Sequence, residues 1–150
     1  MLTILITGGT ILYHILMRFL TGFLFQRFMH NKADYRKKWY QVSRLEQNFY
    51  EKIKVKQWKN KMPTFDPGAF DPKNHTWSEI AQAMCQAELV HETIIVLSFL
   101  PIAEGIWFGD YPVFILTSVM AAMIDLMFVM IQRYNRQRIM KILQRSKGAS

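Results

Sequence analysis

The stretch YPVFILTSVMAAMIDLMFVMIQ, residues 111–132, decides the fold class of this protein. Asp125 is its only charged residue. An α-helix rises about 1.5 Å per residue, so the stretch is long enough to cross a hydrocarbon core of about 30 Å. We therefore predict a membrane-spanning helix over residues 111–132.

Two further apolar stretches, residues 2–25 and 88–107, also have the length of a membrane span. The start of the chain lacks the charged n-region and short apolar core of a cleavable signal peptide, so the first stretch is expected to remain as a span. Residues 105–110 are too few for anything but a tight reversal between the second and third spans, which should form an antiparallel hairpin. The sequence thus predicts an all-α integral membrane protein with about three transmembrane helices, in a single domain over residues 1–150.

The composition favours a membrane protein over a nucleic-acid-binding one. Of the 150 residues, 51% are hydrophobic, and the formal net charge is nevertheless +8. Because the apolar residues are clustered in blocks, we interpret the positive charge as a signal that orients the chain in a membrane. The single cysteine, Cys85, excludes an intrachain disulfide.

The positions of Lys and Arg predict the orientation. Of the nineteen basic residues, twelve lie in residues 27–76, six lie in the tail 133–150, and Arg18 alone lies inside a span. Cytoplasmic loops of membrane proteins carry an excess of Lys and Arg. We therefore expect both basic regions in the cytoplasm, the N-terminus outside, and a multi-pass protein of the bacterial cell membrane.

The first basic region is predicted to contain an amphipathic helix over residues 35–61 that lies on the membrane surface. Apolar residues recur there near helical spacing, and the basic residues provide a face suited to anionic headgroups. The alternative is an ordinary cytoplasmic helix packed on the hairpin. Pro63 should end this helix. Thr76 and Glu79 have the spacing of a capping box, so a new helix should begin at Trp77 and continue into the second span.

The beginning of the second span carries a group of polar side chains. Cys85, Glu88 and Glu92 share one helical face, and His91 lies on its flank. Ionisable groups are costly against lipid, so these should face the protein or a water-filled cleft. Glu88 or Glu92 could orient the imidazole of His91 for proton abstraction. Alternatively, the Glu88 and Glu92 carboxylates lie at headgroup depth and pair with cytoplasmic lysines. Cys85 could form an acyl-thioester intermediate or be a small buried thiol.

The sequence does not favour a metal site. Glu88 and His91 match the Glu-x-x-His spacing of di-iron bundles, but such a site needs two of these motifs and further carboxylates. The four histidines of the chain are too few for the membrane desaturase and hydroxylase type. Neither a His-Glu-x-x-His helix nor a Gly-x-Ser-x-Gly elbow is present in the sequence.

A run of basic residues follows the third span. Guanidinium groups bind phosphate bidentately, so this run is a candidate site for the phosphates of an acyl donor. The basic run consists of Arg133, Tyr134, Asn135, Arg136, Gln137 and Arg138. The alternative is the positive charge that commonly follows a cytoplasmic helix end.

Inside the first span, Arg18 should snorkel or pair with an acid such as Asp125 or Glu92.

Three short motifs resemble those of one family. They are FYEKIKVKQWKNKMP at residues 49–63, AELVH at residues 87–91 and QRYNR at residues 132–136. Together they resemble the bacterial glycosyl-4,4'-diaponeurosporenoate acyltransferases, which perform the last step of staphyloxanthin-type carotenoid biosynthesis. The resemblance extends from about residue 50 to residue 138. It implies transfer of a fatty acyl group to a sugar hydroxyl of a membrane-embedded glycolipid.

These observations lead to one functional hypothesis and one alternative. The hypothesis is an O-acyltransferase that moves a fatty acyl group from a donor such as acyl-CoA to a hydroxyl of a glycosylated or lipid-linked acceptor. His91, oriented by Glu88 or Glu92, would deprotonate that hydroxyl, while the basic run, Cys85 and Trp58 would contact the substrates. The expected partners are membrane lipids, the acyl donor, a hydrophobic or glycolipid acceptor and, if the protein is a homo-oligomer, a second copy of the chain. We expect no nucleic acid, metal or cofactor. The alternative is a non-catalytic membrane protein for assembly or regulation.

Overall fold

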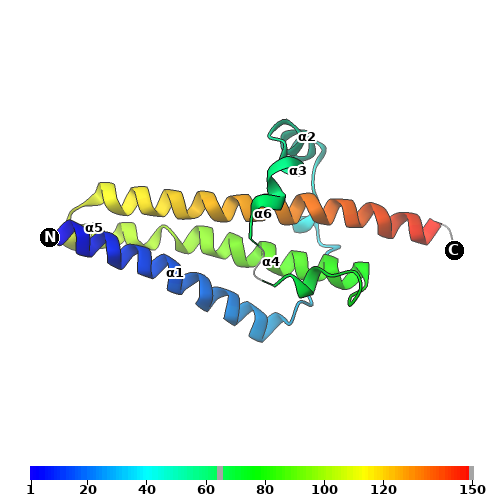
Figure 1. The fold of residues 1–150 in the computed structure, drawn as a ribbon, viewed down its shortest axis with the longest axis horizontal. Helices are drawn as coiled ribbons and strands as arrows, with labels where there is room; N and C mark the ends of the chain where they lie inside the picture. The colour runs from blue at the N-terminus through cyan, green and yellow to red at the C-terminus, as the bar shows by residue number, and fades with distance from the viewer. Residues whose placement is uncertain (64–65, 149–150) are drawn as a thin grey trace. The chain divides into compact units, whose positions relative to one another are not determined.

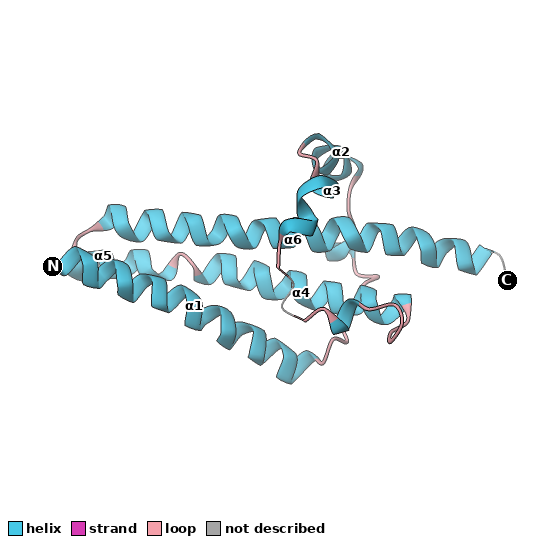
Figure 2. Cartoon of the chain, viewed as in Figure 1, coloured by secondary structure: helices cyan, strands magenta, loops and turns pink. Residues whose placement is uncertain are grey.

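The computed structural model describes residues 1–63 and 66–148, and within this part of the chain it contains helices and no strand (Figures 1 and 2). The all-α prediction is therefore confirmed. The α-helices are α1 (Leu2–Met29), α2 (Arg44–Lys52), α3 (Val55–Trp58), α4 (Trp77–Leu97), α5 (Gly105–Phe108) and α6 (Tyr111–Gly148). Short 3-10 turns lie at Lys38–Tyr40, Lys59–Lys61, Gly68–Phe70 and Leu100–Glu104.

Three helical stretches are long and apolar enough to cross a membrane, as the sequence predicted. They are Leu2–Met29, Trp77–Phe108 and Tyr111–Ser146. The second begins at Trp77, where the capping box was predicted: the Thr76 amide donates to Glu79 Oε2 at 2.7 Å, and the Glu79 amide donates to Thr76 Oγ1 at 3.3 Å. The chain thus has the three spans of an integral membrane protein.

The prediction of one continuous helix over residues 35–61 is wrong. The segment is divided into a 3-10 turn, α2, α3 and a second 3-10 turn. Lys54 has a left-handed backbone with φ of 55°, which separates α2 from α3. The apolar side chains also fail to form one stripe, because Tyr50 and Val55 are buried whereas Leu45 is 82% exposed. Helical spacing alone could not reveal this break.

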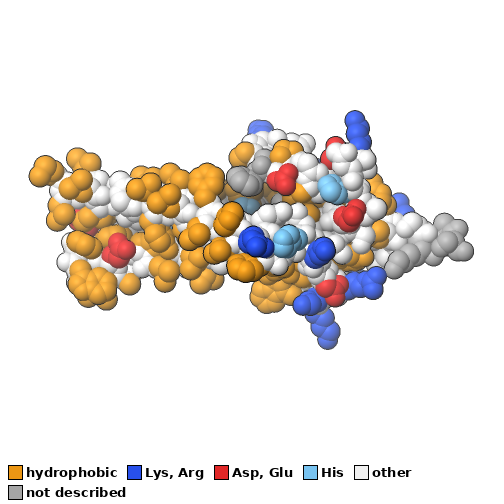
Figure 3. All heavy atoms as spheres, turned by 90° about the horizontal axis from the view of Figure 1, so that it is seen from below, with side chains coloured by type: hydrophobic (Ala, Val, Ile, Leu, Met, Phe, Trp, Pro, Cys, Tyr) orange, Lys and Arg blue, Asp and Glu red, His pale blue; other side chains and the backbone are white. Residues whose placement is uncertain are grey.

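The described chain divides into two compact units, and α4 and α6 each contribute to both. Unit 1 consists of Met1–Phe28 and Leu89–Phe128, and unit 2 consists of Met29–Glu88 and Val129–Ser150. Hydrophobic side chains cover most of the visible surface of unit 1 in Figure 3, whereas charged side chains gather on unit 2.

Helix α1 has a polar interior face and an apolar exterior face. Its buried residues are Thr10, His14, Met17 and Thr21, while Phe19 and other large apolar side chains are exposed. This is the reverse of a helix in water, where burial of apolar surface drives packing. The pattern fits a lipid environment, in which small and polar residues mediate contacts between helices.

Candidate functional site

Each spanning stretch contributes one member to a polar cluster in unit 1. Arg18 lies on α1, His91 on α4 and Asp125 on α6. One Asp125 oxygen, Oδ2, accepts a hydrogen bond from Arg18, and the other, Oδ1, lies 2.8 Å from Nδ1 of His91. Arg18 also donates to the backbone carbonyl of Ala121 at 3.1 Å. The Asp125 side chain is only 1% exposed, so both of its oxygens are committed to these two partners.

This arrangement assigns the proton of the His91 imidazole. A carboxylate bound to a guanidinium can only accept, so Nδ1 of His91 carries the hydrogen and donates it to Asp125. The ring also stacks on Phe128, with centroids 4.6 Å apart and planes 9° from parallel. No hydrogen bond to Nε2 is found among the described residues, and the side chain is 22% exposed. In the neutral imidazole, Nε2 is therefore the nitrogen that carries the lone pair.

Asp125, rather than Glu88 or Glu92, is thus the carboxylate that orients His91. Asp125 was one of the two acids predicted to pair with Arg18, and this ion pair is confirmed. The bond between His91 and Asp125 was not predicted, because the two residues are 34 positions apart on different helices. Glu92 is partly buried on α4 and has an interaction of its own.

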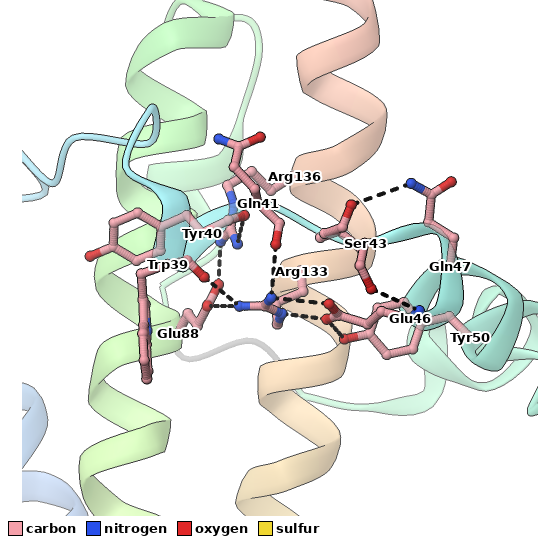
Figure 4. A network of polar contacts seen from close by, with 11 residues as sticks. Trp39, Tyr40, Gln41, Ser43, Glu46, Gln47, Tyr50, Glu88, Arg133 and Arg136 are labelled. Carbon is pink, nitrogen blue, oxygen red and sulfur yellow. Dashed lines mark hydrogen bonds and ion pairs between the residues drawn. The ribbon is translucent and has the colours of Figure 1, made fainter.

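Unit 2 contains a second, denser network built around Glu88 (Figure 4). Glu88 is fully buried, and its two oxygens accept from Arg133 and Arg136. Arg133 also forms an ion pair with Glu46 and donates to the backbone carbonyl of Trp39 at 3.1 Å. Figure 4 shows that these groups come from α4, from α6 and from the segment that precedes and enters α2. The network therefore fastens that segment to the two long helices.

The electrostatics of Glu46 follow from this network. Burial by itself would raise the pKa of the Glu46 carboxyl, but hydrogen bonds from Arg133 and Tyr50 and the charge of Arg133 lower the pKa below its ordinary value overall. Burial and the hydrogen bond to Glu46 raise the pKa of the Tyr50 hydroxyl. Glu46 was not identified from the sequence, although Ser43 and Glu46 have capping-box spacing and the Ser43 hydroxyl does cap α2 at 3.2 Å.

Two of the predicted donor-binding arginines already have partners within the protein. Arg136 is 1% exposed, and it donates to Glu88 and, at 2.7 Å, to the backbone carbonyl of Tyr40. Arg133 is bound to two carboxylates. Both guanidinium groups thus neutralise and hold buried groups within the protein.

The remaining predicted substrate residues differ in exposure. Cys85 is fully buried, as expected of a packed thiol. Arg138 is exposed at the surface of α6. Asn135 accepts a hydrogen bond from Lys59 at 2.6 Å, and the Lys59 ammonium lies 5.4 Å from the ring centroid of Tyr134. The Trp58 indole donates to a backbone carbonyl within its own segment at 3.0 Å, which fixes the orientation of its ring.

Metal chemistry has no donor set in the described part of the chain, where no group of three or more His, Cys, Asp or Glu side chains could hold an ion. The carboxylates that face arginines are already neutralised by them.

Comparison with known proteins identifies the family. The model of the glycosyl-4,4'-diaponeurosporenoate acyltransferase family matches residues 36–145, which is well over half of the chain. The chain belongs to this family. The family resemblance read from the three motifs is therefore confirmed, and membership supports an acyltransferase role in carotenoid biosynthesis. No curated protein and no solved structure matches the chain.

The region matched by the family model contains most residues of the two polar clusters. His91 and Asp125 lie inside residues 36–145, as do Glu88 and the basic run. Arg18, which holds the second oxygen of Asp125, lies before the matched region. The His91–Asp125 pair therefore lies within the part of the chain that the family model matches.

Proposed function

We propose that this protein is an O-acyltransferase that moves a fatty acyl group from an acyl thioester to a hydroxyl of a glycosylated, membrane-embedded acceptor, with His91 as the general base. The observation that carries the proposal is the hydrogen bond between His91 Nδ1 and Asp125 at 2.8 Å, with Arg18 on the other oxygen of that carboxylate. Family membership supports the reaction class.

The reaction requires a hydroxyl oxygen to attack a thioester carbonyl. Nε2 of His91 takes the hydroxyl proton as the new C–O bond forms, and the imidazolium that results is stabilised by the ionised Asp125. The C–S bond then breaks, and His91 returns the proton to the leaving thiolate, so that ester and thiol are the products. Atoms and charge balance without a further reactant. Asp125 acts here as a positioning residue, because it reaches the substrate only through His91.

The surroundings of the pair support a hydrophobic acceptor. His91, Asp125 and Arg18 all belong to stretches with the apolar character of membrane spans. The ring of His91 stacks on Phe128, which shields one imidazole face from water and other solutes. An acceptor that reaches Nε2 along such a surface must itself be soluble in lipid, while its sugar supplies the reacting hydroxyl.

Replacement of His91 by Gln tests the proposal. Gln retains an amide of similar length but cannot take a proton, so acyl transfer should fall about 100-fold or more. The matched control is His75→Gln, because His75 lies in the loop before α4 with an exposed side chain. The assay follows acyl transfer from an acyl thioester to the glycosylated carotenoid acid in membranes with equal amounts of each protein. Unchanged transfer by the His91→Gln protein would refute the assignment of His91 as the general base, whereas no transfer by the unchanged protein would favour the non-catalytic assembly or regulatory alternative.

A further inference from the structure

A group of cationic side chains in unit 2 lies beside a hollow that the proposed chemistry does not use. Lys59 donates to Asn135 at 2.6 Å, and its ammonium also lies over the ring of Tyr134. Burial lowers the pKa of Lys59, and the nearby positive charges of Arg138 and Lys56 lower it further. The charges of Arg138 and Lys56 are thus near enough to repel that of Lys59, and a bound anion would relieve this repulsion.

The partners of these cations differ from those of the neighbouring arginines. Arg133 and Arg136 are neutralised by buried carboxylates. Within residues 1–63 and 66–148, by contrast, no salt bridge joins Lys56, Lys59 or Arg138 to an acid. Their net positive charge is thus left for a ligand.

A partly open hollow of about 230 Å³ borders this group. Asn135 is common to both, because its side chain accepts from Lys59 and also lines the hollow. Most of the other lining residues are apolar, and the volume lies just below the range of about 300–1,000 Å³ typical of ligand clefts. The hollow would therefore hold one part of a larger ligand. Its remaining lining residues are Pro67, Phe70, Met84, Ile131 and Gln132.

We propose that Lys59, Arg138 and Lys56 bind a phosphate group of the acyl thioester donor, and that the adjoining hollow receives an uncharged part of the same molecule. The inference rests on the proposed acyl transfer, since it names the donor as a phosphate-bearing thioester of the coenzyme A kind. Lys59 is the central residue, because its bond to Asn135 holds its ammonium at the edge of the hollow. Arg138 can add a forked guanidinium to the phosphate oxygens.

A soluble donor fits this site better than an anionic lipid headgroup does. A headgroup needs only exposed, flexible lysines, of which the basic region has many. Lys59 is instead partly buried and fixed by Asn135 and Tyr134, beside a hollow with apolar walls. Such a fixed cation next to an apolar surface suits a ligand that carries a phosphate and an uncharged chain in one molecule.

Titration of coenzyme A into the full chain in detergent, followed by calorimetry, tests the inference. The unchanged protein should bind, and Lys59→Gln and Arg138→Gln should each weaken binding about tenfold or more, because a charge-assisted hydrogen bond is lost. Lys37→Gln removes an exposed basic residue elsewhere in unit 2 and should bind as the unchanged protein does. Lys59→Arg should retain most of the affinity, which separates loss of charge from misfolding. Failure of the unchanged protein to bind coenzyme A would overturn the inference, as would full binding by both Gln proteins.

Two further arms identify the ligand group and its source. Pantetheine, which has the thiol arm without phosphate, should not compete with coenzyme A if the phosphate supplies the affinity. Nanodiscs with phosphatidylglycerol should leave coenzyme A binding as it is in phosphatidylcholine nanodiscs. Loss of binding in phosphatidylglycerol would instead identify a headgroup site and overturn the inference.

The inference and the proposed function fail separately. The His91→Gln protein should still bind coenzyme A with unchanged affinity while it no longer transfers the acyl group. If Lys59→Gln and Arg138→Gln bind coenzyme A normally but His91→Gln is inactive, the donor site is wrong and the catalytic proposal stands. If His91→Gln remains fully active while the two Gln substitutions abolish binding, the catalytic proposal is wrong and the donor site stands.

Discussion

Replacement of Asp125 by Asn should inactivate the protein while the fold persists, because the carboxylate serves two donors and the amide can serve only one. Asp125 accepts from Arg18 through Oδ2 and from His91 through Oδ1. Asn has a single acceptor oxygen, and the charged guanidinium competes for it more strongly than the neutral imidazole. The amide NH₂ then faces Nδ1 of His91, so that nitrogen must carry its lone pair toward Asn and the proton moves to Nε2. The imidazole would be held in the tautomer that cannot accept a proton from a substrate.

The size of the effect follows from the two roles. Loss of a general base costs about 10²–10⁴-fold in rate, and loss of the carboxylate that fixes the tautomer in the Ser-His-Asp template costs about 10⁴-fold. We therefore expect a fall of about 10²–10⁴-fold for Asp125→Asn. The protein should still fold and insert, because Asn keeps one acceptor oxygen for Arg18 and Arg18 also retains its bond to the backbone carbonyl of Ala121.

The assay measures the initial rate of transfer of a labelled acyl group into the lipid extract of membranes, at equal amounts of inserted protein. Ser118→Ala is the matched control, because Ser118 is fully buried on the same helix and its hydroxyl has no hydrogen-bond partner among the described residues. Its removal should leave the rate within about twofold. A rate for Asp125→Asn within about threefold of the unchanged protein would refute the assignment of His91 and Asp125 as a catalytic pair.

Three further predictions concern stability. Glu88→Gln should cost about 3–5 kcal/mol and lower the thermal unfolding midpoint in detergent, because it leaves the buried Arg136 guanidinium without a counter-charge, while Arg133 keeps Glu46. An unchanged midpoint would contradict the structural role of this network. The pKa of Glu46 in the folded state lies below its ordinary value of 4.5, so the ion pair of Glu46 with Arg133 stabilises the fold above pH 4.5 and is lost as the pH falls through the lowered pKa. Limited proteolysis should therefore begin to cut near α2 only in acid. Equal cutting at neutral pH would argue against this role of Glu46. Gly105→Ala should lower the free energy of unfolding by about 1–3 kcal/mol in the same thermal measurement, because a Cβ there would lie 2.6 Å from the Tyr111 ring. Gly8→Ala is the control, because a Cβ at Gly8 would meet nothing within 4 Å.

Part of the fold could be read directly from local patterns. The three spans depend on runs of apolar residues, which a membrane requires whatever the packing of the helices. The start of α4 depends on Thr76 and Glu79, which bond to each other across one turn. Both features are determined by residues close together in the sequence.

The break at Lys54 could not be read in this way. Lysine has no particular preference for a left-handed backbone, yet Lys54 adopts it between α2 and α3. Tyr50 before this turn and Val55 after it are both buried. Tertiary packing here overrides the local periodicity.

The sequence by itself determined a membrane-spanning helical protein of this acyltransferase family, and it identified His91 and the basic run as candidate site residues. Spacing along one helix relates only residues three or four positions apart, so it suggested Glu88 as the partner of His91. Only the tertiary structure decided that Asp125 orients His91, that Glu88 neutralises Arg133 and Arg136, and that Lys59 bonds to Asn135. The physical reason is that ion pairs form between whichever charges the packed helices bring within hydrogen-bonding distance, and separation along the chain does not limit that choice.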